Sequence, residues 1–172
     1  MASALRNLSK YDENNLPAVK GMTFAIAVSE WNSEITFKLY EGCFDTLIKL
    51  GVNENDIKRV VVPGTFELPT AARMLEQKYS PDAVICIGCV ITGETRHDEY
   101  INNACAQALA LLGTQTGKPF IFGVLTPSTY QQALDRAGGK HGNKGIEAAI
   151  TAVRMAALRK EMTDRTSVGF KR

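Results

Sequence analysis

The sequence predicts an α/β domain with three layers, in which helices cover both faces of a four-stranded parallel sheet. Short apolar runs of strand length alternate along the chain with longer segments of helical periodicity. The strand runs are apolar almost without interruption, which is typical of strands buried on both faces. This alternation favours right-handed crossovers and a doubly wound fold. The 172 residues are enough for one such domain.

The first strand and helix are expected at residues 23–29 and 33–50. The strand is a run of small and branched apolar residues, and the helix is followed by Gly51, a common residue just past a helix end. Apolar side chains recur along this helix at helical spacing: Ile35, Leu39, Cys43, Leu47 and Leu50.

Three further strands, each followed by helical sequence, complete the pattern. The strands are expected at residues 59–62, 83–91 and 120–125. Helical spacing recurs at residues 68–79, 100–112 and 146–157. Pro69 falls in a first helical turn, where proline is tolerated. The central helix is expected to end at Gly113 or Gly117, and Ser128–Gln131 has the pattern of a capping box that opens a short helix.

Both ends of the chain are expected to lie outside the domain, which spans residues 21–162. Residues 1–20 form a polar N-terminal arm, either disordered or lying on another subunit, and residues 163–172 form a flexible tail. No secretory signal is readable, and the longest apolar run, residues 83–91, is far below the roughly 20 residues that span a membrane. The expected compartment is therefore the cytoplasm, without a membrane partner.

The composition is that of an ordinary globular protein. Hydrophobic residues make up 45% of the chain and charged residues 22%. Lys and Arg number 20 against 18 Asp and Glu, which gives a net charge of +2. This balance argues against a protein built to hold nucleic acid.

The four cysteines are expected to fill the core. Cys86 and Cys89 have the CxxC spacing of many metal and redox sites. They fall inside a predicted buried strand, however, where residues three positions apart point to opposite faces. No second CxxC or nearby histidine pair completes a zinc set. We therefore predict no metal site, and small apolar filling for Cys43, Cys86, Cys89 and Cys105.

Ligands of doubly wound folds bind outside the carboxyl ends of the strands, so the residues after each strand form the candidate site. Trp31 and Asn32 follow the first strand, and Trp31 is the only tryptophan. Trp31 either packs in the core or provides a stacking wall for a flat ring. Asn32 either caps the following helix or forms a hydrogen bond with a ligand.

The second strand ends in the segment PGTFELP, residues 63–69. Its Pro–Gly turn leads the chain toward the expected cleft and places Phe66 and Glu67 at a helix start. Glu67 either interacts with the helix N-terminus or accepts hydroxyl and N–H donors from a ligand.

The segment after the third strand, GETRHDEY at residues 93–100, is the most informative. A glycine turn that opens a helix leaves free backbone N–H groups, which together with Thr95 suit an anion. His97 is adjacent, and histidine side chains exchange protons near neutral pH. A surface hydrogen bond at the helix start is the alternative role of His97, but the anion turn, the neighbouring aromatic residue and the strand end favour catalysis.

The fourth strand contains Phe122 and is followed, after the short helix, by the glycine-rich basic segment DRAGGKHGNKG at residues 135–145. This segment is either a plain loop between helices or a means of bringing Arg136 to a phosphate group, with which a guanidinium pairs well. His141 is interpreted as a loop residue.

Five segments, taken together in this order, resemble the lumazine synthase (6,7-dimethyl-8-ribityllumazine synthase) family. They are Trp31-Asn32, PGTFELP at 63–69, GCVITGETRHDEY at 88–100, PFIFGVLT at 119–126 and DRAGGKHGNKG at 135–145. The resemblance covers about residues 22–157. It implies the penultimate step of riboflavin biosynthesis, a transferase-type condensation of 5-amino-6-(D-ribitylamino)uracil with 3,4-dihydroxy-2-butanone 4-phosphate. The implied products are 6,7-dimethyl-8-ribityllumazine, phosphate and water, and no metal or organic cofactor is implied.

The resemblance also implies a role for each site residue. Those implied to bind the pyrimidine and its ribityl chain are Trp31, Asn32, Thr65, Phe66, Glu67, Val90 and Ile91. Those implied to bind the phosphate are Gly93, Glu94 and Thr95. His97 is the implied acid–base group, and Lys144 is a second implied catalytic residue. Phe122 and Arg136 would enter from an adjacent subunit, Phe122 to close the pocket and Arg136 to bind the phosphate.

The resemblance further implies a homopentamer. Twelve pentamers forming an icosahedral 60-subunit shell are favoured here, because the segment at residues 138–145 lacks the insertion that some pentamer-only relatives carry. Pro17 in the arm argues for the free pentamer or a pentamer pair instead. Riboflavin synthase is a candidate protein partner. The alternative functions are a flavodoxin-like module that binds a flavin or nucleotide without chemistry, and a shell that stores flavin. The chain lacks the glycine-rich nucleotide motifs at its strand ends.

Overall fold

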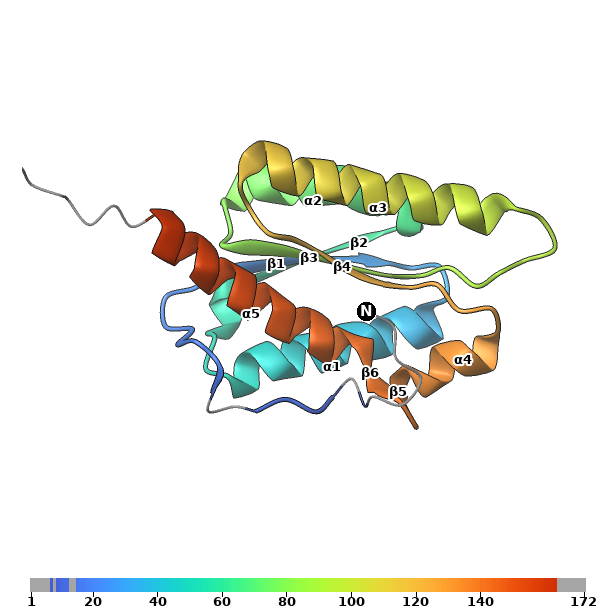
Figure 1. The fold of residues 1–172 in the computed structure, drawn as a ribbon, viewed down its shortest axis with the longest axis horizontal. Helices are drawn as coiled ribbons and strands as arrows, with labels where there is room; N and C mark the ends of the chain where they lie inside the picture. The colour runs from blue at the N-terminus through green and yellow to red at the C-terminus, as the bar shows by residue number, and fades with distance from the viewer. Residues whose placement is uncertain (1–6, 8, 13–14, 164–172) are drawn as a thin grey trace, which may run out of the picture.

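The computed structural model describes Asn7, residues 9–12 and residues 15–163, and it has three layers (Figure 1). The central sheet has four parallel strands in the order β2–β1–β3–β4. Helices α2 and α3 cover one face, and helices α1, α4 and α5 lie on the other (Figure 1). The predicted three-layer αβα architecture with a flavodoxin-like parallel sheet is therefore confirmed.

The bounds of the elements follow the predicted alternation closely. The strands of the sheet are β1 (Phe24–Ser29), β2 (Ile57–Val62), β3 (Ala83–Cys89) and β4 (Phe120–Leu125). The long helices are α1 (Ser33–Lys49), α2 (Leu68–Tyr79), α3 (His97–Thr116) and α5 (Lys144–Thr163). Shorter elements are the 3₁₀ helices η2 (Glu54–Asp56) and η3 (Thr65–Glu67), the helix α4 (Tyr130–Asp135), and the strands β5 (Ala137–Gly139) and β6 (Gly142–Asn143).

Two predicted details of these elements were wrong, and two further points are decided by the structure. Strand β3 ends at Cys89 rather than Ile91, although the chain beyond it stays beside β4, since Val90 N donates to Leu125 O at 2.9 Å and Thr92 N donates to Pro127 O at 3.0 Å. Helix α3 begins at His97, which agrees with the predicted helix start at this histidine, whereas the apolar pattern of the helix begins only at residue 100. The cap of α4 is Thr129, whose hydroxyl accepts from Gln132 N, so the expected capping box is displaced by one residue. The segment at residues 135–145 is not a plain loop, since β5 and β6 form an antiparallel hairpin within it.

The core is divided by the sheet into two apolar clusters. Alternate side chains of β1 point to opposite faces: Phe24, Ile26 and Val28 pack with α1 and α5, while Ala25 and Ala27 pack with α2 and α3. All six residues of β1 are buried, as the uninterrupted apolar run predicts.

The cysteines occupy this core as predicted. Cys86 belongs to the cluster under α2 and α3, whereas Cys89, three positions on, belongs to the cluster on the other face. All four cysteines are free and buried, and burial raises the pKa of Cys89 to about 12 and that of Cys105 to about 11. Their thiols are therefore protonated at neutral pH. Among the described residues, no cluster of His, Cys, Asp and Glu could hold a metal ion.

The described part of the arm lies along its own chain, on the side of α1 and the β5–β6 hairpin (Figure 1). Asn143 N donates to Ser9 Oγ at 2.9 Å, and the ammonium group of Lys49 lies 6.0 Å from the ring centre of Tyr11. Residues 164–172, nearly all of the predicted tail, lie outside the described residues. Within the described residues, no helix is both long and apolar enough to cross a membrane.

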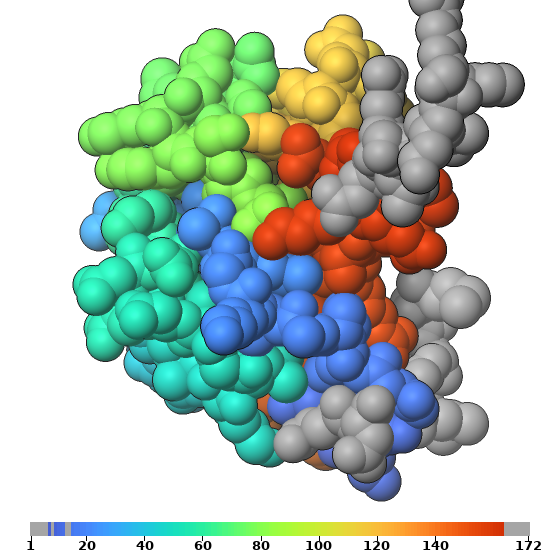
Figure 2. Space-filling model, turned by 90° about the vertical axis from the view of Figure 1, so that its left-hand side faces the viewer, coloured from blue at the N-terminus to red at the C-terminus, as the bar shows by residue number. Residues whose placement is uncertain are grey.

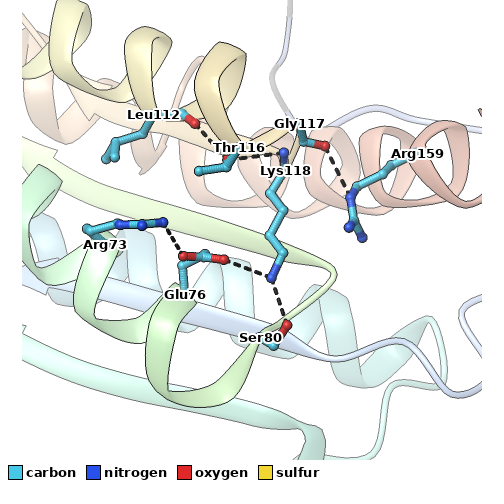
Figure 3. A network of polar contacts seen from close by, with 8 residues as sticks. All are labelled: Arg73, Glu76, Ser80, Leu112, Thr116, Gly117, Lys118 and Arg159. Atoms are coloured by element: carbon cyan, nitrogen blue, oxygen red, sulfur yellow. Dashed lines mark hydrogen bonds and ion pairs between the residues drawn. The ribbon is translucent and has the colours of Figure 1, made fainter. Parts of the chain in front are cut away.

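The amino ends of the strands are closed by polar contacts. At this end of the molecule the α2–β3 turn, the α3–β4 turn and the end of α5 lie side by side (Figure 2). Lys118, just before β4, bonds to Glu76 and Ser80 at the end of α2, and Arg159 Nε of α5 donates to Gly117 O (Figure 3). These contacts lie at the end of the sheet opposite the carboxyl ends of the strands.

Candidate active site

A cleft of about 760 Å³ lies at the carboxyl edge of the sheet, between the exits of β1, β2 and β3 and the first turns of α3. Doubly wound folds bind their ligands at this edge. Most of the predicted site residues line the cleft: Trp31, Asn32, Thr65, Phe66, Glu67, Val90, Ile91, Gly93, Thr95 and His97. Segments that are far apart in the sequence therefore form one site.

The exit of β1 places Trp31 at the cleft with its ring in the open. Trp31 is 73% exposed in the single chain, so the alternative of core packing is wrong. Its backbone N–H donates to Pro63 O at 3.0 Å, which ties it to the exit of β2. Asn32 occupies the N-cap position of α1, but its side chain does not cap the helix; instead, Nδ2 donates to Cys89 O at 2.9 Å.

The exit of β2 forms the second wall of the cleft. Thr65 is buried against β3, and this packing depends on Gly88, since a Cβ atom at Gly88 would lie 2.6 Å from Thr65 Oγ1. Phe66 and Glu67 of η3 remain exposed on the cleft side, the first an aromatic ring and the second a carboxylate. Glu67 occupies the N-cap position of α2 without a side-chain capping bond, so the predicted interaction with the helix N-terminus and the predicted contact with a ligand both remain open to it.

The exit of β3 forms the third wall, with Val90 and Ile91 half-buried and the glycine turn beyond them. Gly93 and Thr95 line the cleft just before the N-terminus of α3, where unpaired backbone N–H groups favour an anion. His97 is the first residue of α3 and is exposed to the cleft. The guanidinium group of Arg96 turns to Glu99, which accepts from its Nε at 3.0 Å and its Nη2 at 2.7 Å.

Some lining residues were missed by the reading of the sequence. Cys89, Asp98, Tyr100 and Ile101 also line the cleft. Tyr100 and Ile101 were predicted as the first residues of the apolar pattern of this helix, and not as lining residues. With α3 starting at His97, positions 97, 98 and 101 fall on neighbouring parts of one helix surface. The predicted helix start at His97 therefore carried the signal that could have pointed to Asp98.

Four predicted residues do not line the cleft of their own chain: Glu94, Phe122, Arg136 and Lys144. Phe122 is half-buried in β4 and packs against the cluster under α2 and α3. Arg136 and Lys144 flank the β5–β6 hairpin, where Lys144 N donates to Arg136 O at 2.9 Å. The ammonium group of Lys144 lies 2.5 Å from Glu147 Oε1.

The fold and the site are those of an α/β protein with a small-molecule site at the carboxyl ends of its parallel strands. The site combines exposed aromatic rings, a glycine turn at a helix N-terminus and a histidine. The family model of 6,7-dimethyl-8-ribityllumazine synthase matches residues 21–160, most of the chain. The chain belongs to this family.

Curated relatives agree with this assignment. The 6,7-dimethyl-8-ribityllumazine synthase of Cytophaga hutchinsonii is 52% identical over 91% of this chain and 98% of its own length. Its counterpart in Porphyromonas gingivalis is 49% identical over 92% of this chain and 98% of its own length. The enzyme of the same name from Flavobacterium johnsoniae is 48% identical over 94% of this chain and 85% of its own length.

Proposed function

We propose that the cleft at the carboxyl edge binds 5-amino-6-(D-ribitylamino)uracil and 3,4-dihydroxy-2-butanone 4-phosphate and condenses them to 6,7-dimethyl-8-ribityllumazine. As a member of its family, the chain is a transferase-type condensing enzyme of riboflavin biosynthesis. The observation that carries the proposed site is the convergence of an exposed tryptophan, a glycine turn at a helix N-terminus and His97 in one cleft. Family membership favours this reaction over a flavin- or nucleotide-binding module without catalysis.

The pyrimidine fits the wall formed by Trp31 and Phe66. Both rings are exposed on the cleft side, so a planar ligand can stack on them. The Asn32 amide oxygen makes no hydrogen bond within the described part of the chain and is free to accept a ring N–H. The Glu67 carboxylate serves the ribityl hydroxyls as acceptor, with Thr65, Val90 and Ile91 along the same surface.

The phosphate fits the turn before α3. Gly93 and Thr95 line the cleft there, and the N-terminus of a 20-residue helix favours negative charge. Glu94, which lies just outside the lining, contributes its backbone N–H in this proposal. The phosphate end of the butanone then lies near His97, at the same end of α3.

The chemistry requires proximity and proton transfer. The amine of the pyrimidine attacks the ketone and loses water to form an imine, phosphate leaves from the butanone chain, and ring closure releases a second water. His97 accepts and returns the protons of these steps. Holding both substrates together contributes about 7–11 kcal/mol to lowering the barrier. None of these steps requires a redox change.

The site is completed by a neighbouring subunit. Phe122, Arg136 and Lys144 lie outside the cleft of their own chain and are assigned to the cleft of the next one. Helix α3 supports such an assembly, since residues 101–116 carry no charged side chain and only Cys105 and Leu109 of this helix are buried. Leu111 is exposed on it. An uncharged exposed face of this kind marks a protein interface. A repeated head-to-tail contact closes into a ring, here the pentamer.

Riboflavin synthase is the proposed consumer of the product, and the cytoplasm is the proposed location.

Two experiments test this function. Purified protein mixed with both substrates is expected to produce lumazine fluorescence, and no product under any condition would contradict the proposed reaction. The shared site is tested by mixing Trp31→Ala/His97→Ala subunits with Arg136→Ala subunits, at a butanone phosphate concentration that leaves each variant alone strongly impaired, under conditions that exchange subunits. Recovered activity supports sites shared between chains, and no recovery despite proven exchange contradicts them.

A further inference from the structure

The backbone at Asn32 lies in the left-handed region, with φ 60° and ψ 43°. Within the described residues, Ser80 is the only other non-glycine residue with positive φ. Asparagine is among the few side chains that tolerate this conformation. The conformation turns the chain sharply between Trp31 and the first turn of α1, where Asn32 O accepts from Ile35 N at 2.8 Å.

The side chain of Asn32 crosses from the exit of β1 to the exit of β3. Pairing between these two strands ends at Val28 and Ile87. Beyond that point, the hydrogen bond from Asn32 Nδ2 to Cys89 O links the two exits. Cys89, Val90 and Ile91 all line the cleft, so this bond joins the Trp31 segment to the third wall.

The backbone at Trp31 is therefore held from two sides, although the indole ring is exposed. The Trp31 backbone N–H donates to Pro63 O on the β2 side, while the next residue is bonded to Cys89 O on the β3 side. We infer that Asn32 is a positioning residue, whose left-handed backbone and bond to Cys89 O fix the Trp31 ring over the cleft before substrate arrives. This inference rests on the proposed function only for its consequence, which is tighter binding of the pyrimidine.

Two variants separate this role from a direct contact with substrate. Asn32→Gly keeps the left-handed backbone and removes the whole amide. Asn32→Asp keeps a side-chain oxygen that can accept from the pyrimidine and is tolerated in the left-handed region, but it has no N–H for Cys89 O. If Asn32 acts only on the substrate, Asn32→Asp keeps the acceptor oxygen and should keep the parent KM for the pyrimidine, whereas Asn32→Gly should not. If Asn32 positions Trp31, both variants should show a more mobile Trp31 ring and weaker binding of the pyrimidine.

Trp31 is the only tryptophan in the chain, so its fluorescence reports on this position alone. Without substrates, both variants are expected to show lower tryptophan anisotropy and stronger quenching by acrylamide than the parent. With substrates, KM for the pyrimidine is expected to rise about 3–10-fold, the range of one lost hydrogen bond, with a smaller change for the butanone phosphate. Asn53→Asp is the matched control, since Asn53 lies before η2 and its side chain only accepts from Asn55 N. It is expected to change neither readout.

Parent-like anisotropy and quenching in both variants would overturn the inference, as would a parent-like pyrimidine KM for Asn32→Asp. The fluorescence arm needs no turnover. If the parent made no lumazine, the proposed function would fail while the positioning of Trp31 would still be decided by anisotropy.

Discussion

Lys118 Nζ lies 2.9 Å from Glu76 Oε1, and the two side chains are only 11% and 12% exposed. Ser80 Oγ accepts from the same ammonium group at 2.8 Å, and Arg73 Nη1 lies 2.5 Å from the other carboxylate oxygen of Glu76 (Figure 3). This network joins the end of α2 to the start of β4 at the end of the sheet opposite the cleft. It therefore concerns stability rather than catalysis.

We predict that Lys118→Met lowers the free energy of unfolding by about 2 kcal/mol, because it leaves the poorly hydrated Glu76 carboxylate with Arg73 alone. Lys160→Met is the matched control. Lys160 also pairs with an acidic residue at this end, Asp82, but at 3.4 Å and with 40% exposure, so its loss is expected to cost less than about 1 kcal/mol. Urea denaturation measures the free energy of unfolding of both variants. Equal losses of stability would show that burial of the Lys118–Glu76 pair contributes nothing.

The two histidines of the chain provide a paired test of the acid–base assignment. His97→Ala is expected to lower kcat about 10²-fold, the lower end for a positioned acid–base group, because proximity of the substrates is retained. Both KM values should change little. His141→Ala, on the turn between β5 and β6, should leave kcat unchanged. Steady-state kinetics of both variants decides the matter, and comparable losses would remove His97 from its assigned role.

The hydroxyl of Tyr130 at the start of α4 donates to Glu34 Oε2 in the first turn of α1. This hydrogen bond, followed by burial and the charge of Glu34, raises the pKa of Tyr130 above its ordinary value near 10. The neutral tyrosine is the form favoured by folding. Its contribution to stability is therefore complete below pH 10 and is lost as the pH rises through the raised pKa.

We accordingly expect Tyr130→Phe to be less stable than the parent at pH 8, with the difference shrinking above pH 10. Unfolding in urea across this range measures the difference between the two proteins. Tyr79→Phe is the control, since the Tyr79 hydroxyl makes no hydrogen bond within the described residues. A difference between parent and Tyr130→Phe that stays constant up to strongly alkaline pH would refute the coupling.

Arg136→Ala is expected to raise KM for the butanone phosphate about tenfold or more, because a desolvated guanidinium–phosphate contact contributes about 1.5–3 kcal/mol. KM for the pyrimidine should change much less. Lys140→Ala removes another cation from the same segment, one that is exposed and paired with Asp135 at 3.2 Å, and should change neither value. Equal effects of Arg136→Ala on both substrates would contradict the phosphate assignment.

The sheet and its long helices were predictable because burial on both faces imposes an unbroken apolar pattern. Strand β1 is an example, with all six residues buried. Element ends were less predictable where side chains do not carry the signal. Val90 and Ile91 are apolar but lie beyond the end of β3, where Val90 N still donates to the carbonyl of Leu125, the last residue of β4. The strands of the β5–β6 hairpin are short and rich in glycine, so the sequence has no alternating side-chain pattern that would predict them.

The candidate site was predictable to the extent that it follows strand ends. Trp31 and Phe66 follow the ends of β1 and β2 by a few residues, and His97 opens the helix after β3, an arrangement that the predicted order of the elements already indicated. The bond from Asn32 to Cys89 O was not predictable, because it depends on a left-handed backbone and on where two strands separate in space. Asp98 was missed although the predicted helix start at His97 already placed it in the first turn of α3.

The last prediction concerns assembly, for which we expect a closed icosahedral shell of twelve pentamers rather than a free pentamer. Strand β5 ends at Gly139 and β6 begins at Gly142, so the hairpin between α4 and α5 is short and presents no insertion to block contact between pentamers. Pro17 is the feature that argues for the smaller species, because a proline in the arm cannot donate to a neighbouring sheet. The described arm, however, contacts its own chain through Ser9 and Asn143, which leaves the approach of another pentamer open. Light scattering in phosphate buffer is expected to find a particle on the order of a megadalton. A species of about five chain masses would rule out the shell, and a monomer would rule out the shared active site as well.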